Sequence, residues 1–221
     1  MAKIDLIIYR LIARELEAEA FEQWVYSENA LESFLGPDNY LALMSLDYSL
    51  PSSLNEAEKI CKPYIDIASY HEWSLRRVLQ GVIDRPNDAS NYIKQCYKLY
   101  CDGYGFLDNL GLGYGLAIAV SSSGLSSGPS SGLSSGLSSG PSSGPSCEGD
   151  AATGNALTSP AQKKLIDSFY PAICKEAEKV LHWLDVQKIV LTGHDGGAQG
   201  IQYSDNRTLK EKAPTAYEVA K

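Results

Sequence analysis

Apolar residues recur every three or four positions through most of the chain, which is the spacing of one face of an α-helix. The first such stripe runs from Ile4 to Ile12 and predicts a helix of about ten residues, a length typical of globular proteins. A second helix is expected over residues 16–26. Ser27 is expected to cap a short third helix that ends at Gly36, and the apolar run 40–46 is predicted to be helical as well.

The next two helices carry stronger boundary signals. Ser53 is expected to cap a helix over 54–65, in which Pro63 would cause a kink. The tetrapeptide from Ser69 to Glu72 has the pattern of a capping box, in which hydroxyl and carboxylate each satisfy a free amide at a helix start. We therefore expect a further helix to begin there and to end at Pro86.

Two more helices follow. A Tyr-rich stripe over 92–100 predicts a helix that closes near Gly103. Ser159 and Pro160 have the pattern of a cap followed by proline at the first helical position. They predict the longest helix of the chain, over 160–184, with a bend at Pro171.

Strand patterns appear only near the C-terminal end. Residues 188–192 and 200–204 flank a turn that contains Asp195, Gly196 and Gly197, which predicts a β-hairpin. An isolated hairpin is marginally stable, so we expect it to pack on the helices. The predicted fold class is mainly α, with a small C-terminal hairpin.

A low-complexity repeat interrupts this pattern. Residues 122–145 are consecutive tetrapeptides of the form Ser-Ser-Gly-Leu or Ser-Ser-Gly-Pro, which cannot bury enough apolar area to offset chain entropy. The repeat matches the G-x-S-x-G pattern of hydrolases, but it provides no strand and helix around the serine. We predict one helical domain made of 1–120 and 157–221, with 121–156 as an inserted, disordered loop.

Composition narrows the class of protein. The 221 residues include 27 acidic and 19 basic ones, a net charge of −8 that disfavours binding to nucleic acid or to anionic membranes. Neither a spanning apolar run nor a secretory signal is recognised, and five dispersed cysteines do not form a disulfide framework. We therefore expect a cytoplasmic protein with reduced thiols; its oligomeric state stays open.

Candidate chemical groups are few. His71 and His182 lie in predicted helices, and His194 with Asp195 in the hairpin turn lacks further metal ligands nearby. Cys96 and Cys101 are interpreted as packing residues. The sequence thus predicts no catalytic, cofactor-binding or metal-binding residues and favours a protein without catalytic activity, although enzymatic activity stays open.

Two segments are candidates for partner binding. Five glutamates from Glu15 to Glu28, with no Lys or Arg among them, form either a solvated helix face or a surface that attracts a basic partner. The Gly- and Tyr-rich stretch 101–116 is either a packed turn or a protein-binding loop. The predicted contact residues of these two segments are Glu17, Glu19, Glu22, Asp102, Tyr104, Asp108 and Tyr114.

Residues 21–26, 40–48 and 101–116 together resemble small acidic bacterial proteins that are encoded beside polymorphic toxins and act as their immunity proteins. The resemblance covers about 1–120 and 157–205 and consists of aromatic and apolar patterns. It implies a cytosolic inhibitor, without catalytic activity, that binds one cognate toxin. The Ser-Gly repeat departs from this group. The alternative is a small-molecule-binding domain or enzyme with a pocket between helices that gathers Tyr, His and acidic side chains.

Overall fold

The computed structural model describes residues 3–122, 160–193 and 201–212. Over these residues the chain is mainly helical and contains a two-stranded antiparallel hairpin, which confirms the predicted fold class. The Ser-Gly repeat beyond Ser122 lies outside the described residues. So does the hairpin turn with His194 and Asp195.

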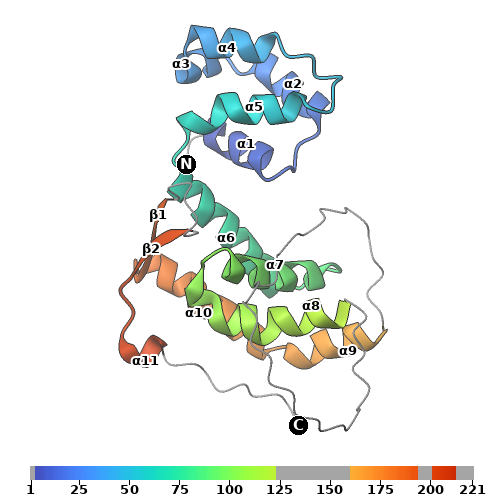
Figure 1. Ribbon diagram of the computed structural model, residues 1–221, viewed down its shortest axis with the longest axis vertical. Helices are drawn as coiled ribbons and strands as arrows, with labels where there is room; N and C mark the ends of the chain where they lie inside the picture. Colours follow the sequence, from blue (N-terminus) through green and yellow to red (C-terminus); the bar gives the residue numbers. More distant parts are fainter. Residues whose placement is uncertain (1–2, 123–159, 194–200, 213–221) are drawn as a thin grey trace, which may run out of the picture.

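The helices form two groups that are stacked along the long axis of the molecule (Figure 1). The first group, here called the N-terminal lobe, comprises residues 3–66. Its elements are α1 (Lys3–Ile12), α2 (Ala18–Ser27), α3 (Leu31–Leu35), α4 (Pro37–Met44), α5 (Ser53–Cys61) and the 3-10 helix η1 (Lys62–Tyr64). Its core contains the predicted apolar positions Ile8 and Leu11 of α1 and Phe21 of α2, all fully buried.

The second group, the C-terminal lobe, comprises the described residues from 67 onward. Its elements are α6 (Ile67–Asp84), α7 (Ala89–Cys101), the 3-10 helix η2 (Gly105–Leu107), the π-helix η3 (Asn109–Gly115), α8 (Leu116–Ser122), α9 (Pro160–Phe169), α10 (Ala172–Asp185), β1 (Ile189–Gly193), β2 (Gln202–Asp205) and α11 (Leu209–Lys212). The hairpin packs on this core through Ile189, Leu191 and Ile201, as predicted.

Helix α6 contributes to both cores. Its first two turns place Tyr70 and Trp73 against the core of the N-terminal lobe. Leu75 and Leu79 are fully buried in the core of the C-terminal lobe. The two buried clusters are therefore distinct but joined by one continuous helix, and the expectation of a single domain stays a prediction.

The three predicted serine caps are wrong. Ser27 is the last residue of α2, and its hydroxyl donates to the Trp24 carbonyl at 3.1 Å. Ser53 is the first residue of α5 and not the residue before it, and its buried hydroxyl has no hydrogen-bond partner within the described residues. Helix α6 begins before Ser69, because Asp66 caps it by accepting from the amides of Ala68 and Ser69. Each of these serines lies near a helix boundary, but its hydroxyl does not bind the free amides at the start of a helix.

The predicted long helix over 160–184 is also wrong, since Tyr170 and Pro171 separate α9 from α10. Proline has no amide hydrogen and its ring clashes with the preceding turn, so the predicted bend is a break. The longest helix is α6, with 18 residues. The apolar stripe still packs on one core, since Ile166 and Ile173 are both buried there.

The glycine-rich stretch is a helical segment and not a loop. A Cβ atom on Gly111 would lie 2.5 Å from the Cβ of Tyr100, and one on Gly115 would lie 2.9 Å from the carbonyl oxygen of Ile93. These glycines therefore allow η3 to approach the backbone of α7 closely. Within the stretch, the left-handed backbone occurs at Gly103, where α7 ends.

Substitution of Asp66 tests the cap of α6. The Ser69 hydroxyl and the two backbone amides bind the carboxylate and lower the pKa of Asp66. Asp66→Ala should cost about 1 kcal/mol of unfolding free energy at pH 7. Because the folded pKa is depressed, this contribution is present above the unfolded pKa of about 4 and is lost as the pH falls through the folded value. Urea titrations from pH 7 to pH 3 should show the difference from the parent shrink, and Asp66→Asn should cost less at pH 7.

Substitution of Gly115 tests the contact between η3 and α7. Alanine has the higher helix propensity by about 1 kcal/mol, yet Gly115→Ala should destabilise the protein by about 1–3 kcal/mol, because the nearest atoms are the Cβ of Tyr97 and backbone atoms of Ile93 and Tyr97 in α7, which cannot swing away like the end of a flexible side chain. Leu112→Ala in the same segment is the control, since Leu112 is 43% exposed and should change stability by about 0.5 kcal/mol or less. Equal stabilities by urea denaturation would contradict the close approach.

Candidate functional site

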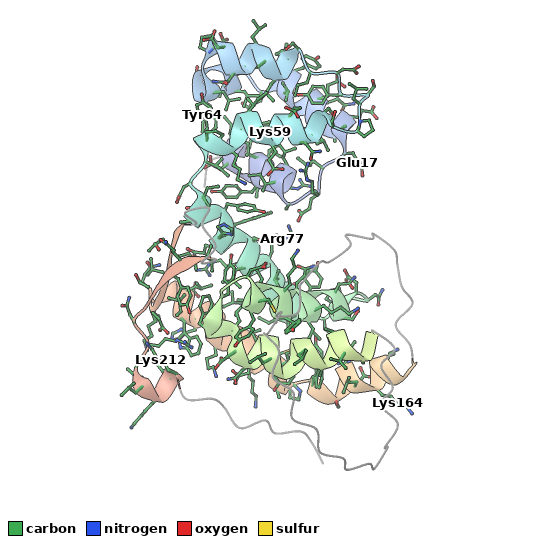
Figure 2. The ribbon with its side chains drawn as sticks, viewed as in Figure 1. Glu17, Lys59, Tyr64, Arg77, Lys164 and Lys212 are labelled. Carbon is green, nitrogen blue, oxygen red and sulfur yellow. The ribbon has the colours of Figure 1, made fainter. Side chains whose placement is uncertain are left out.

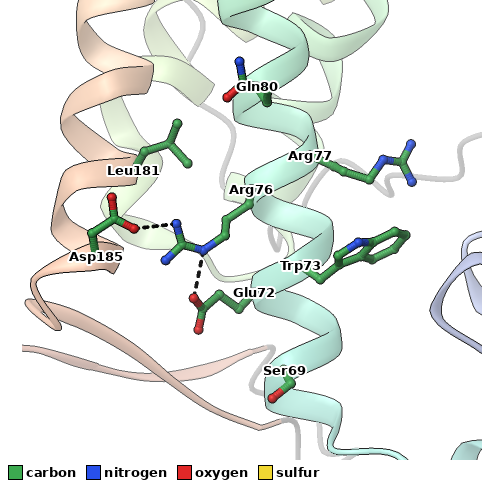
Figure 3. A pocket seen from close by; sticks show the side chains of 8 residues that line it. All are labelled: Ser69, Glu72, Trp73, Arg76, Arg77, Gln80, Leu181 and Asp185. Carbon is green, nitrogen blue, oxygen red and sulfur yellow. Dashed lines mark hydrogen bonds and ion pairs between the residues drawn. The ribbon is translucent and has the colours of Figure 1, made fainter. Parts of the chain in front are cut away.

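A groove of about 630 Å³ runs along α6 and is bounded by α6 and α10 (Figure 3). Six of its lining residues come from α6 at helical spacing, and two come from α10. They are Ser69, Glu72, Trp73, Arg76, Arg77 and Gln80 of α6, with Leu181 and Asp185 of α10.

Arg76 connects the two walls of the groove. Its Nε donates to Glu72 at 2.8 Å and its Nη1 donates to Asp185 at 2.7 Å, as the dashed lines in Figure 3 mark. Partial burial opposes the charged form of Arg76, but the two carboxylates outweigh it and raise the pKa. The positive charge is therefore neutralised within the groove.

Arg77 connects the two lobes and lies between them in Figure 2. Its guanidinium forms an ion pair with Glu15, from the segment that joins α1 and α2. The same guanidinium stacks over the Trp73 ring, 5.0 Å from the ring centroid. The contact between Glu15 and Arg77, here called the interlobe ion pair, thus combines a charge interaction with a cation–π contact.

The groove does not supply the site that the alternative function requires. That function needs Tyr, His and acidic side chains to converge in one pocket. Here the lining combines two arginines with Glu72 and Asp185, and Glu15 of the N-terminal lobe pairs with Arg77. Its charged groups are used to hold helices together.

The predicted contact tyrosines of the glycine-rich stretch are core residues. Tyr104 is 3% exposed, and its hydroxyl lies 3.0 Å from Nδ1 of His71. Tyr114 is 9% exposed and packs edge-on against Phe169. Burial raises the pKa of Tyr104. In the structure both rings are therefore packed in the core, which favours the packed-turn alternative over the protein-binding loop for this part of the stretch, and a contact role for the two tyrosines stays a prediction.

The two acidic residues of this stretch have different positions. Asp108 is half-buried and its carboxylate accepts from the amide of Asn109 at 2.8 Å, at the start of η3. Asp102 is exposed, and its carbonyl oxygen accepts from the amide of Ile201. Asp108 thus has a capping role, and the carboxylate of Asp102 stays on the surface.

The three predicted contact glutamates of the N-terminal lobe lie at its surface. Glu17 and Glu19 are exposed and Glu22 is half-buried. The neighbouring Glu15 and Glu28 are paired with Arg77 and Lys3. Within the described residues no ion pair is formed by Glu17, Glu19 or Glu22, so three predicted contact residues present negative charge to solvent.

The structure adds two apolar residues that the sequence analysis did not single out. Tyr26 of α2 is 51% exposed and Leu41 of α4 is 69% exposed. The available signal was helical spacing, because Tyr26 follows Glu19 by seven residues and Glu22 by four and so shares their face of α2. The exposure of Leu41 could not be predicted in this way, because the segment 40–46 was predicted as one apolar run without a distinct exposed face.

Among the residues that the structure describes, no three His, Cys, Asp or Glu side chains are grouped so that they would hold a metal ion. None of the helices described in the structure is long and apolar enough to cross a membrane. Comparison with protein-family models, curated proteins and solved structures found no match. The resemblance to immunity proteins therefore stays a prediction.

A double-mutant cycle tests the interlobe ion pair. Glu15→Gln and Arg77→Met should show a coupling of about 0.2–1 kcal/mol in unfolding free energy at low salt, the range of partly exposed pairs. The coupling should shrink as ionic strength rises. Glu17→Gln is the matched control, because Glu17 lies two residues away without an ion pair in the described residues. A cycle of Glu17 with Arg77 that gave the same coupling would contradict a specific contact.

Proposed function

We propose that this protein is an inhibitor without catalytic activity, which neutralises a cognate bacterial toxin by direct stoichiometric binding. The observation that supports this proposal is the segregation of charge along the chain. Residues 15–58 hold ten of the 27 acidic residues and none of the 19 basic ones, so the rest of the chain carries slightly more positive than negative charge. The entire net negative charge belongs to one part of the N-terminal lobe.

Much of this charge is not compensated within the chain. Four of the ten carboxylates, those of Glu15, Glu28, Glu56 and Glu58, are paired with lysine or arginine. The remaining six form no ion pair within the described residues, and they are Glu17, Glu19, Glu22, Glu32, Asp38 and Asp47.

The elements that carry these groups lie at one end of the molecule. Helices α3 and α4 are at the end away from the C-terminal lobe, with α2 beside them (Figure 1). A concentrated negative potential at one end attracts and orients a basic partner and repels nucleic acid. This property suits an inhibitor that must reach one basic protein quickly.

Co-expression with each toxin encoded beside the gene tests the proposed function. Protection of the cells, together with a one-to-one complex of the two purified proteins, is the expected result. Turnover of a small molecule by the purified protein, without protection against any neighbouring toxin, would overturn the proposal and support the enzyme alternative.

Charge reversal tests the role of the acidic helix. The triple change Glu17→Lys, Glu19→Lys and Glu22→Lys should lower the association rate with the toxin about tenfold or more at low salt, with less effect on dissociation. Surface plasmon resonance at several salt concentrations measures both rates.

The matched control for charge reversal is Asp84→Lys, Asp88→Lys and Glu178→Lys. These three residues are exposed in the C-terminal lobe, so their reversal changes the net charge equally. If both triple variants lost association rate to the same extent, the total charge would matter and not its position on the N-terminal lobe.

A further inference from the structure

We infer that the outer face of α2 and the adjoining side of α4 form a docking surface for a basic protein surface that presents an aliphatic side chain among its Lys and Arg residues. Tyr26 and Leu41 are its apolar anchors, and the uncompensated carboxylates of α2 are its rim. The inference rests on the proposed function and deepens it, because it names the contact surface and the chemistry of the partner.

The two faces of α2 differ in character. Phe21 and Val25 are fully buried in the core of the N-terminal lobe. Glu19, Glu22 and Tyr26 follow one another at spacings of three and four residues and therefore share a second face, on which Glu19 and Tyr26 are exposed and Glu22 is half-buried. An exposed tyrosine thus lies directly in line with two carboxylates that form no ion pair in the described structure.

The exposed apolar groups of α2 and α4 are neighbours. The Tyr26 hydroxyl donates to the carbonyl oxygen of Met44 at 3.5 Å, which places the ring over the end of α4. Leu41 precedes Met44 by three residues and therefore lies about one turn before it along α4. Glu22 and Tyr26 also lie close to the buried Tyr48 and contribute, after its burial and Cys61, to raising its pKa. Tyr26 and Glu22 thus lie near the end of α4, and Leu41 is exposed about one turn earlier on the same helix.

The chemistry of the patch selects the partner. A half-exposed tyrosine and a two-thirds-exposed leucine offer the aromatic and aliphatic contact area that binding hot spots use. Surrounding carboxylates would contact Lys or Arg at the rim, where charge pairs mainly affect association. A second copy of this chain is disfavoured, because a symmetric contact would bring the same carboxylates together. Nucleic acid and anionic lipid are repelled for the same reason.

Two synthetic peptides test this surface. The first is a labelled amphipathic helical peptide of Lys and Leu, and the second has every Leu replaced with Ser and keeps the same charge. Fluorescence anisotropy should show that the Lys/Leu peptide binds the protein about tenfold more tightly than the Lys/Ser peptide, because it also fills the apolar contacts.

Variants locate the binding. The double change Tyr26→Ser and Leu41→Ser should weaken the Lys/Leu peptide about tenfold and leave the Lys/Ser peptide unchanged. Tyr26→Phe keeps the ring and should bind like the parent. The matched control is Val186→Ser with Leu209→Ser, which removes apolar groups that are 45% and 88% exposed in the C-terminal lobe. Circular dichroism melts confirm that each variant is folded.

The outcomes separate this inference from the proposed function. Equal affinity for the two peptides, absence of binding, or unchanged Lys/Leu binding by the folded double variant would overturn the docking surface. Cell protection by co-expression would still support the toxin inhibitor in that event. Conversely, Tyr26- and Leu41-dependent binding of the Lys/Leu peptide without any protection would retain the docking surface and overturn the inhibitor.

Discussion

Burial of both ends of α6 is the constraint on which the rest of the structure depends. The first turns of this helix press Tyr70 and Trp73 against one core, and its later turns bury Leu75 and Leu79 in the other. An 18-residue helix is about 27 Å long, which is enough to reach both cores. Because the backbone of α6 is continuous, the position of the N-terminal lobe is set by the side chains at its start.

Aromatic contacts strengthen this connection. Tyr9 of α1 packs against Tyr70 and Trp73, with ring centroids 5.6 Å apart in both pairs. From α6 the contacts continue into the C-terminal lobe as pairs of neighbouring rings. The series is Tyr70 with His71, His71 with Tyr104, Tyr104 with Phe106, and Phe106 with Tyr203 of the hairpin. Edge-to-face aromatic pairs contribute stability beyond that of their buried area. These tyrosines therefore stabilise the fold whether or not a partner binds.

The two lobes differ in how their charged residues are paired. Two arginines of the C-terminal lobe hold its own elements together: Arg76 joins α6 to α10, and Arg207 stacks on Trp183 while it binds Asp205. The N-terminal lobe has a complete apolar core, yet six carboxylates of residues 15–58 form no ion pair in the described structure. Surface carboxylates contribute little to stability, so this lobe can present them to a partner without weakening its core.

The sequence by itself determined most of the helical segments, because an apolar stripe and a terminating Gly36, Pro86 or Gly103 act locally. It did not determine that residues 109–122 are helical or that the predicted helix 160–184 is divided into α9 and α10. It also located the hairpin strands and the acidic surface of α2. The structure was needed to decide whether Asp66 or Ser69 caps α6, because Asp66 precedes Ser69 by about one turn and both residue types suit an N-cap. Likewise, burial of Tyr104 and the pairing of Glu15 with Arg77 depend on contacts between residues far apart in the chain, and local spacing carries no information about such contacts.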